Sequence, residues 1–388
     1  MNPFRPGAGH MPPYLAGREP QTEEFQKLLE QSAITDNMIL TGLRGVGKTV
    51  FLETLKPLAI DAGWMWANAD LSESTSITED RIARRILTDL SLITSSLVIA
   101  AEETASPVFG KPPEIKERKM EYRVLQHLYD ETPGLVTDKV KAVLEIAWTY
   151  LKKAGKRGVV FAYDEAQTMA DHADKNEYPL ASMLEVFQSI QRKGVPFLLV
   201  LTGLPTLFAR LVESRTYSER MFHVVFLDRL NYDDSKDAIL TPLVDSDISL
   251  SDESVETVIE ISGGYPYFIQ FICREVFDLF RAGQRSVPVN EITAKLDTDF
   301  FAGRWQRLTD RQRELLVAAA RLPNCESEFT VQDITERSKE IGKPFTASHA
   351  NQMLVSLGDK GLVFKNRHGK YLFAVPLLWS FILRQEGD

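Results

Sequence analysis

The chain contains little cysteine and no clustered metal ligands. Its two cysteines, Cys273 and Cys325, lie far apart in the sequence, and its six histidines are scattered without metal-ligand spacing. A disulfide framework needs several cysteines, and a structural zinc site needs closely spaced cysteines or histidines. The composition therefore argues against both and fits a reducing compartment.

Long apolar runs and an excess of positive charge are also missing. The longest apolar run spans residues 195–205, whereas a membrane-crossing helix needs roughly 20 residues. The first residues are rich in proline and glycine and lack the apolar segment of a secretory signal. The net charge of -9 excludes a uniformly basic nucleic-acid-binding protein but leaves a local basic face open. We expect a cytoplasmic protein with no membrane contact.

What is present is an alternation of short apolar runs and helical segments. A chain of 388 residues predicts two or three domains. Buried strands separated by helices are typical of a parallel sheet that is covered on both faces, an α/β fold of three layers. The expected strands are 37–41, 64–70, 159–165, 196–203 and 222–227.

A long segment between the second and third of these strands, 78–154, is predicted to be mostly helical. It is interrupted by 105–119, which contains three prolines and is interpreted as a loop. Two interpretations of the segment remain open: an insertion that carries partner contacts, or additional packing helices with a mobile loop.

Residues 42–49, GLRGVGKT, match the phosphate-loop pattern GxxxxGK[ST] between a strand and a helix. Glycines let the backbone N–H groups approach phosphate oxygens, and the following helix presents its positive N-terminal end. Lysine then reaches the β- and γ-phosphates, and the threonine hydroxyl ligates Mg²⁺. The pattern predicts that ATP and Mg²⁺ are bound by Gly42, Gly45, Val46, Gly47, Lys48, Thr49 and Val50.

The second half of such a site is an apolar strand that ends in acids. Residues 159–165 supply it, with Asp164 predicted to hold Mg²⁺ through water and Glu165 to polarise the attacking water. Thr202, near the end of the next strand, has two interpretations. It either approaches the γ-phosphate and the attacking water, or it caps the helix that begins near Pro205.

Two arginines precede the last expected strand, Arg215 and Arg220. An arginine there can project toward the γ-phosphate of a neighbouring subunit and stabilise the charge of the transition state. Arg220 is the stronger candidate for this catalytic role. The alternative is that both are solvated surface side chains.

The C-terminal part changes in pattern. Residues 231–307 predict a helical lid and connector after a core that ends at 230. Residues 308–388 predict three helices and a hairpin, which is the order of a winged helix. A polar third helix and a basic hairpin suit double-stranded DNA, although a winged helix can equally contact protein. The predicted DNA contacts are Ser348, Asn351, Lys365, Arg367 and Lys370, with His368 beside them.

These motifs together resemble the AAA+ ATPases related to the origin-recognition initiators, and the neighbouring STAND-type ATPases and transposition regulators. The resemblance covers about residues 12–281, with a winged helix as the usual companion. It implies that Thr202 is a sensor residue and that Arg220 is the arginine finger. It also implies an adenine-side segment formed by Tyr14, Leu15, Gly17 and Arg18.

One position departs from the initiators. They carry an arginine early in the lid helix that touches the γ-phosphate, whereas this chain reads Gly263-Gly264-Tyr265-Pro266. Pro266 can pack against the nucleotide and fix the helix start, but it cannot donate a hydrogen bond. This form resembles the switch-type ATPases and favours slow hydrolysis.

The sequence therefore predicts an ATP-dependent switch that assembles with itself and binds DNA through its winged helix. The alternative is a STAND-like signalling, defence or mobile-element regulator whose winged helix contacts protein. A small-molecule kinase shares the phosphate loop, but the C-terminal domains would have no acceptor-binding role.

Overall fold

The computed structural model describes residues 1–7, 9–75, 77–104, 114–367 and 369–386. Its internal contacts divide the chain into two compact units. The sheet unit comprises residues 19–41 and 51–226, and the C-terminal unit comprises residues 1–18, 42–50 and 227–388. The phosphate-loop motif therefore groups with the C-terminal unit, although it follows the first strand directly in sequence.

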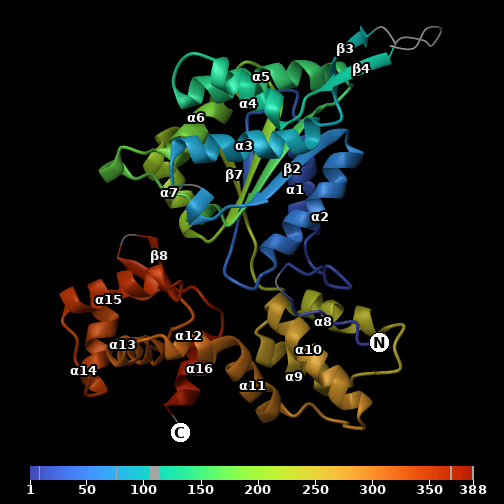
Figure 1. Cartoon of the computed structure of the whole chain (residues 1–388). Coiled ribbons are helices and arrows are strands. Elements are labelled where there is room, and N and C mark those ends of the chain that lie inside the picture. The colour runs from blue at the N-terminus through green and yellow to red at the C-terminus, as the bar shows by residue number, and fades with distance from the viewer. Residues whose placement is uncertain (8, 76, 105–113, 368, 387–388) are drawn as a thin grey trace. The chain divides into compact units, whose positions relative to one another are not determined.

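The sheet unit is built on five parallel strands in the order β2-β5-β6-β1-β7 (Figure 1). Parallel neighbours need crossover connections, and the intervening helices provide them. This arrangement confirms the predicted α/β parallel sheet. The strands are β1 (Asn37–Thr41), β2 (Trp64–Asp70), β5 (Gly158–Asp164), β6 (Phe197–Gly203) and β7 (Phe222–Phe226).

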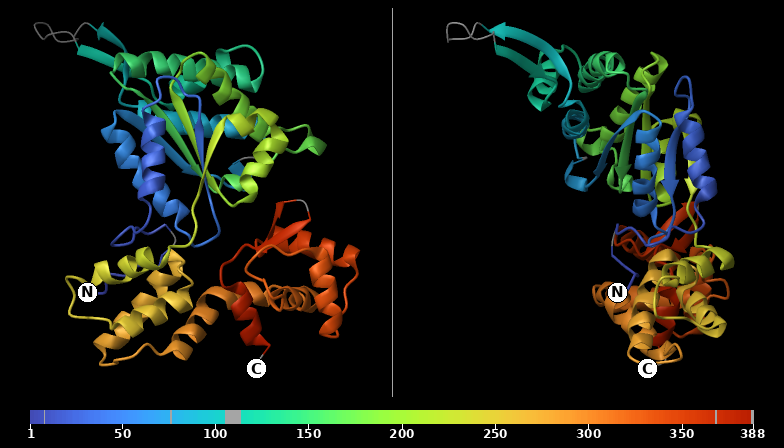
Figure 2. Two further views of the ribbon diagram at one scale, coloured as in Figure 1. Left: turned by 180° about the vertical axis from the view of Figure 1, so that it is seen from behind. Right: turned by 90° about the vertical axis from the view of Figure 1, so that its right-hand side faces the viewer.

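Helices cover both faces of this sheet, which explains the nearly continuous apolar strands. Phe161 and Phe197 lie on one face and share a core with the helices α3 (Glu79–Thr94), α5 (Val136–Lys153) and α6 (Pro179–Arg192). On the other face, Phe25 of α1 (Glu19–Leu29) meets Trp66 of β2 edge-on, with ring centroids 6.2 Å apart. The two layers of helices are seen on either side of the sheet in the right-hand view of Figure 2.

The connection between β2 and β5 is longer than a simple crossover, because it contains α3, α4 and α5. The helices of the sheet unit are α1 (Glu19–Leu29), α2 (Lys48–Asp61), which begins in the phosphate loop, α3 (Glu79–Thr94), α4 (Tyr122–Glu131), α5 (Val136–Lys153), α6 (Pro179–Arg192) and α7 (Thr206–Ser214). Short 3₁₀ turns lie at Glu73–Thr75, Ala166–Thr168, Ala173–Lys175 and Thr216–Arg220. None of the helices in the described parts of the chain is both long and apolar enough to cross a membrane.

The segment between β2 and β5 contains a hairpin as well as helices. β3 (Val98–Thr104) pairs antiparallel with β4 (Glu114–Lys119). The predicted loop over 105–119 is therefore wrong for its last six residues, and residues 105–113 lie outside the described part of the chain. The sequence EIKERK lacks the apolar alternation that signals a strand, and its strand character comes from backbone pairing with β3.

After β7, the C-terminal unit forms a group of helices around one apolar core. These helices are α8 (Tyr232–Leu240), α9 (Asp252–Ser262), α10 (Pro266–Arg281) and α11 (Val289–Leu296), with a 3₁₀ turn at Thr241–Leu243. A π-helical turn, Asp297–Ala302, continues into α12 (Gly303–Gln306). Phe301 stacks on Phe381 at 5.2 Å, so the core runs on into the last segment.

The last segment has the predicted order of three helices and a hairpin. Its elements are α13 (Asp310–Ala320), α14 (Val331–Glu340), α15 (Ala347–Asp359), β8 (Val363–Arg367), β9 (Lys370–Phe373) and α16 (Leu378–Gln385). Thr309 and Thr330 begin α13 and α14 with capping boxes, as their side chains accept N–H bonds three residues on. An isolated bridge between Phe329 and Tyr371 adds a third antiparallel partner to the hairpin.

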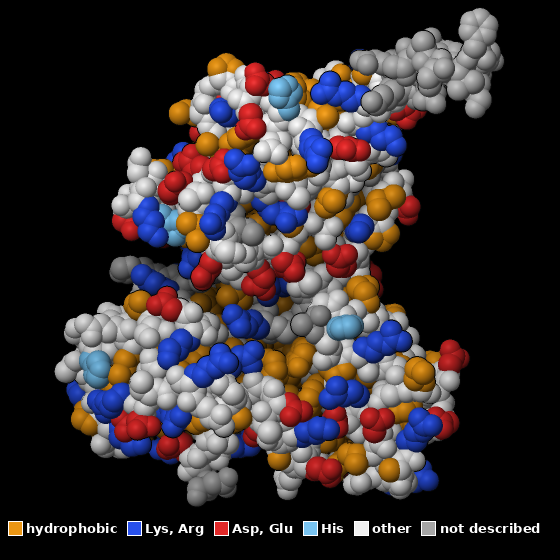
Figure 3. All heavy atoms as spheres, in the orientation of Figure 1, with side chains coloured by type: hydrophobic (Ala, Val, Ile, Leu, Met, Phe, Trp, Pro, Cys, Tyr) orange, Lys and Arg blue, Asp and Glu red, His pale blue; other side chains and the backbone are white. Residues whose placement is uncertain are grey.

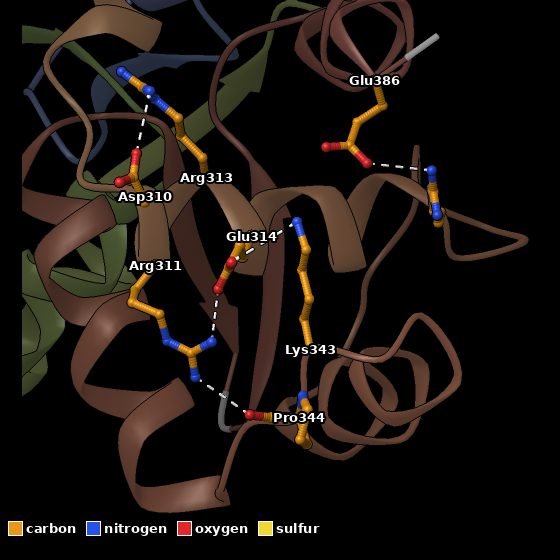
Figure 4. A network of polar contacts seen from close by, with 8 residues as sticks. Asp310, Arg311, Arg313, Glu314, Lys343, Pro344 and Glu386 are labelled. Atoms are coloured by element: carbon orange, nitrogen blue, oxygen red, sulfur yellow. Dashed lines mark hydrogen bonds and ion pairs between the residues drawn. The ribbon is translucent and has the colours of Figure 1, made fainter.

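Polar contacts fasten α13 to the turn before α15 (Figure 4). Arg311 donates to Glu314 at 2.6 Å and to the Pro344 carbonyl at 3.3 Å, while its guanidinium lies over the ring of Phe345. Lys343 approaches the same Glu314 at 3.8 Å. These contacts fix the start of α15.

Candidate nucleotide site

The phosphate loop adopts a backbone that favours glycine. Gly45 and Gly47 have φ angles of 82° and 89°, in the left-handed region, and α2 begins at Lys48. Left-handed residues among right-handed ones turn successive N–H groups toward one concave side, which suits an anion. Gly42 is fixed by space instead, because a Cβ there would lie 2.2 Å from the Leu227 carbonyl oxygen.

Lys48 curls back over this loop. Its Nζ donates to the carbonyl oxygens of Gly42 at 3.0 Å and Leu43 at 2.9 Å. Thr49 and Val50, which complete the predicted set, are half-buried in the first turn of α2, and Val46 is buried. A lysine held at the mouth of a loop of N–H groups can bind phosphate as a point charge.

The predicted adenine-side segment anchors the loop from outside. The Arg18 side chain is buried and donates to the carbonyl oxygens of Val46 at 3.0 Å and Asp228 at 2.8 Å. Gly17 has a φ of 61°, and a Cβ there would lie 2.3 Å from Asp234. Tyr14 and Leu15 are half-buried, with Tyr14 against the core of the C-terminal unit.

The start of α10 touches the phosphate loop. Gly263 ends α9 with a left-handed φ of 58°, and Pro266 is the first residue of α10. The next residue, Tyr267, donates its N–H to the Gly45 carbonyl at 3.1 Å. Sequence reasoning singled out Pro266 and missed Tyr267, since a backbone contact leaves no residue-type signal.

The acidic residues Asp164 and Glu165 stand at the carboxyl end of β5, and Thr202 lies near the carboxyl end of the neighbouring β6. Tyr163 of β5 pairs with Leu201 of β6, so Asp164 and Thr202, the next residue on each strand, lie side by side at this end of the sheet. Asp164 is buried and accepts the Glu165 N–H at 2.7 Å. Glu165 is exposed and has a φ of 53°, a conformation that non-glycine residues seldom adopt.

Thr202 does not cap a helix. α7 begins at Thr206, and its N-cap is Pro205, which has no side-chain capping bond. The Thr202 hydroxyl is fully buried and has no hydrogen-bond partner within the described chain. A buried polar group without a partner is uncommon and calls for an explanation. The capping interpretation is therefore wrong, and the sensor role stays a prediction.

Sequence reasoning also missed Gln167, which follows the acids. Its amide nitrogen donates to Glu165 Oε2, and its amide oxygen accepts the Leu204 N–H at 3.1 Å. The sequence gives only a weak signal for Gln167, namely an amide side chain two residues after Glu165. Its link to the end of β6 is visible only once the two strands are paired.

The two candidate arginines differ in surroundings. Arg220 is exposed at the end of the Thr216–Arg220 turn, and its side chain has no polar partner in the described residues. Arg215 is half-buried and donates to the Ser214 carbonyl at 3.2 Å. The arginine-finger role of Arg220 stays a prediction.

The predicted DNA contacts are mostly exposed. Ser348 and Asn351 lie on the exposed side of α15, and Asn351 accepts a bond from the Tyr371 hydroxyl at 3.2 Å. Lys365 and Arg367 are exposed on β8, while Lys370 is half-buried at the start of β9. His368 lies outside the described residues.

Arg367 is engaged by a carboxylate. It forms an ion pair with Glu328, at 2.5 Å between Nη2 and Oε2, and this bond together with that from Asn366 holds the Glu328 pKa below its ordinary value. The guanidinium would have to exchange this partner for a phosphate oxygen if the hairpin binds DNA.

Further arginines gather near α12. Burial, and then the neighbouring guanidinium groups of Arg44 and Arg307, lower the pKa of Arg304. Arg44 comes from the phosphate loop, and a Cβ on Gly361, just before β8, would lie 2.8 Å from its Nη2. Lys and Arg side chains collect around α12 in the space-filling view (Figure 3).

A phosphate loop after β1 and an acidic strand end on β5 define a P-loop nucleotide-binding protein. The family model described as AAA ATPase domain matches residues 14–247, so the chain belongs to that family. It is an AAA+ P-loop ATPase, which binds nucleotide and hydrolyses ATP. The prediction of this family and activity is confirmed. Residues 298–382 match a second model, described as a domain of unknown function (DUF8462).

Solved structures share the fold at low sequence identity. The Walker-type ATPase PABY2304 of Pyrococcus abyssi superposes with a TM-score of 0.60 at 15% identity, over 95% of this chain and 96% of that one. The ORC2 protein of Aeropyrum pernix in its ADP form superposes with a TM-score of 0.57 at 15% identity, over 99% of this chain and 98% of that one. No curated protein matches the sequence.

Proposed function

We propose that this ATPase is a nucleotide-dependent switch that assembles with itself and binds double-stranded DNA through residues 308–388 as a winged helix. The observation that carries the proposal is the set of contacts of the phosphate loop inside the C-terminal unit. Gly45 accepts the Tyr267 N–H at the start of α10, and Arg44 lies against Gly361 before β8. A phosphate that rearranges the loop would act on both elements at once.

The phosphate chemistry divides among a few side chains. Lys48 exchanges its bonds to carbonyl oxygens for bonds to the β- and γ-phosphates. Thr49 and Asp164 offer hydroxyl and carboxylate oxygens, the donors that Mg²⁺ prefers, and the ion would neutralise charge on the phosphates. Glu165 polarises the attacking water, and the Thr202 hydroxyl donates toward the γ-phosphate or that water.

Slow hydrolysis fits the switch. The first turn of α10 carries Pro266 where the initiators carry an arginine, so no guanidinium from that position can stabilise the transition state. An arginine supplied by another subunit, Arg220, would then make hydrolysis depend on assembly. Such a protein keeps ATP bound as a monomer and hydrolyses it once it has assembled.

DNA binding is supported by exposure and by charge. The outer side of α15 presents polar side chains to solvent, and Lys365 and Arg367 follow on the adjacent hairpin. The polar side of α15 would contact base edges in the groove, and the basic hairpin would contact phosphates. The arginines near α12 add positive charge from the phosphate-loop side.

A second candidate is a regulator whose C-terminal segment contacts protein. The sequence of α15 contains no lysine or arginine, and Val355 on its outer side is 62% exposed. An exposed apolar side chain on a neutral helix favours a protein surface over a phosphate backbone.

The two candidates separate in one titration. Duplex DNA is titrated at several salt concentrations with ADP and with a non-hydrolysable ATP analogue, and the size of the protein is measured in each state. Tighter, salt-dependent binding and a larger assembly with the analogue support the switch on DNA. Absence of binding in both nucleotide states would favour the protein-contact regulator.

Arg44→Ala sharpens this test, because it removes the contact with the turn before β8 and leaves the loop glycines in place. We expect it to bind the ATP analogue while DNA affinity loses its dependence on nucleotide. Arg285→Ala is the matched control, an exposed arginine between α10 and α11.

A further inference from the structure

Gln167 joins the side chain of Glu165 to the end of β6. Its amide nitrogen donates to Glu165 Oε2, and its amide oxygen accepts the Leu204 N–H at 3.1 Å. Leu204 stands two residues after Thr202. A single side chain therefore connects the carboxylate after β5 with the strand end that carries the buried hydroxyl.

The surroundings of this amide leave it little freedom. A Cβ on Gly203 would lie 2.6 Å from Gln167 Oε1 and 3.0 Å from Leu207 Cδ2, so a larger residue at 203 would displace the amide. The backbone carbonyl of Gln167 accepts a bond from Arg210 at 2.5 Å, which involves the main chain and not the amide.

Glu165 is a residue for which such support matters. Its side chain is exposed, and within the described chain its Oε1 has no hydrogen-bond partner, while Oε2 is bound by Gln167. An exposed glutamate otherwise exchanges among several rotamers, and a group that polarises water acts only from the correct place.

We propose that Gln167 is a positioning residue for ATP hydrolysis. By holding Oε2, it leaves Oε1 of Glu165 directed to accept a hydrogen bond from the attacking water. The bond to Leu204 fixes the position of the Glu165 carboxylate relative to the end of β6, so that Glu165 and Thr202 can act on the same water. This inference rests on the proposed role of Glu165.

The test compares full-length variants by ATP affinity and by single-turnover hydrolysis. Gln167→Ala should keep ATP affinity unchanged and lower the hydrolysis rate about 10- to 100-fold, the order of magnitude known for outer-shell partners of metal ligands. Gln167→Met keeps the side-chain length without the amide and serves if alanine prevents folding. Arg210→Ala is the matched control, because it removes a bond to the backbone of Gln167 only, and it should hydrolyse normally.

The comparison of binding with hydrolysis distinguishes positioning from a structural effect. A general loss of structure would lower ATP affinity and the hydrolysis rate together, whereas loss of positioning lowers the hydrolysis rate and leaves ATP affinity unchanged.

Two outcomes overturn the proposal. The first is that Gln167→Ala hydrolyses ATP at the wild-type rate or faster. The second is that Arg210→Ala loses as much hydrolysis rate as Gln167→Ala. The proposed role of Glu165 is checked separately with Glu165→Gln, and in the double variant the Gln167 change should cost nothing more. If Glu165→Gln hydrolyses normally, the role of Glu165 itself is wrong, whatever Gln167 does.

Discussion

At the scale of single residues, the buried hydroxyl of Thr202 is the most informative feature at the carboxyl end of the sheet. A buried hydroxyl without a partner costs about 1–3 kcal/mol, and Thr202 belongs to an otherwise apolar strand. Valine has nearly the same shape and would remove that cost. The threonine is thus costly to stability at this position, and the predicted sensor role would account for it.

Thr202→Val should therefore raise the melting temperature, by about 2–4 °C for each kcal/mol gained, and lower the rate of ATP hydrolysis. Tyr163→Phe is the control, because it removes another buried hydroxyl without a partner in the described chain, on the face of β5 that packs against α3, α5 and α6. It should stabilise the protein without slowing hydrolysis. Equal hydrolysis in wild type and Thr202→Val would contradict the sensor role.

Lys48 is the residue on which nucleotide binding depends most. Lys48→Ala removes the point charge that faces the phosphates, and we expect a loss of at least about 100-fold in ATP affinity, or about 2.7 kcal/mol. Lys56→Ala, on the same helix, should bind normally. Isothermal titration with ATP decides this, and wild-type affinity in Lys48→Ala would refute the assignment of the loop.

At the scale of elements, one ion-pair group joins α10 to α11. Glu275 lies between Lys295, at 2.5 Å, and Arg274, at 2.8 Å. Burial raises the pKa of Glu275, but the hydrogen bonds from Lys295 and Arg274 outweigh it, and the net pKa lies below the ordinary value. The ionised form is therefore favoured in the folded protein.

The sign of the pH effect follows from this direction. A carboxylate with a lowered folded-state pKa stabilises the fold above its unfolded-state pKa, and the contribution disappears as pH falls through the folded-state value. Glu275→Gln should thus lower the melting temperature at neutral pH, and the difference from wild type should vanish in acid. A difference that persists unchanged below pH 3 would show that the packing of Glu275, not its charge, matters.

The hairpin of the last segment offers a two-directional test of DNA binding. Arg367→Glu with Lys370→Glu should weaken duplex binding and make its salt dependence shallower, since each lost phosphate contact removes about 0.9 from the slope. Glu328→Gln frees Arg367 from its ion pair and should act in the opposite direction. Identical salt plots for all three proteins would exclude this hairpin from DNA contact.

At the scale of the whole molecule, self-assembly is testable through Arg220. Arg220→Ala and Glu165→Gln should each hydrolyse ATP slowly alone. In a mixture, an intact Arg220 can meet an intact Glu165 across a subunit boundary, so activity should partly return. A mixture no more active than its components would place Arg220 outside catalysis.

The sequence by itself determined the local elements. The five sheet strands were predicted to within two residues at each end, because buried parallel strands are continuous apolar runs between polar segments. The phosphate loop was equally evident, since its glycines and lysine are required by backbone shape and charge within eight consecutive residues. Lys48, Thr49, Asp164 and Glu165 could therefore be named without a structure.

Only the tertiary structure decided which distant groups meet. β4 became a strand because β3 pairs with it, and Thr202 lost its capping role because α7 starts after Pro205. The bond of Gln167 to Leu204 and that of Tyr267 to Gly45 each join segments far apart in sequence. The physical reason is that backbone donors and acceptors are the same at every residue, so packing, not residue type, selects their partners.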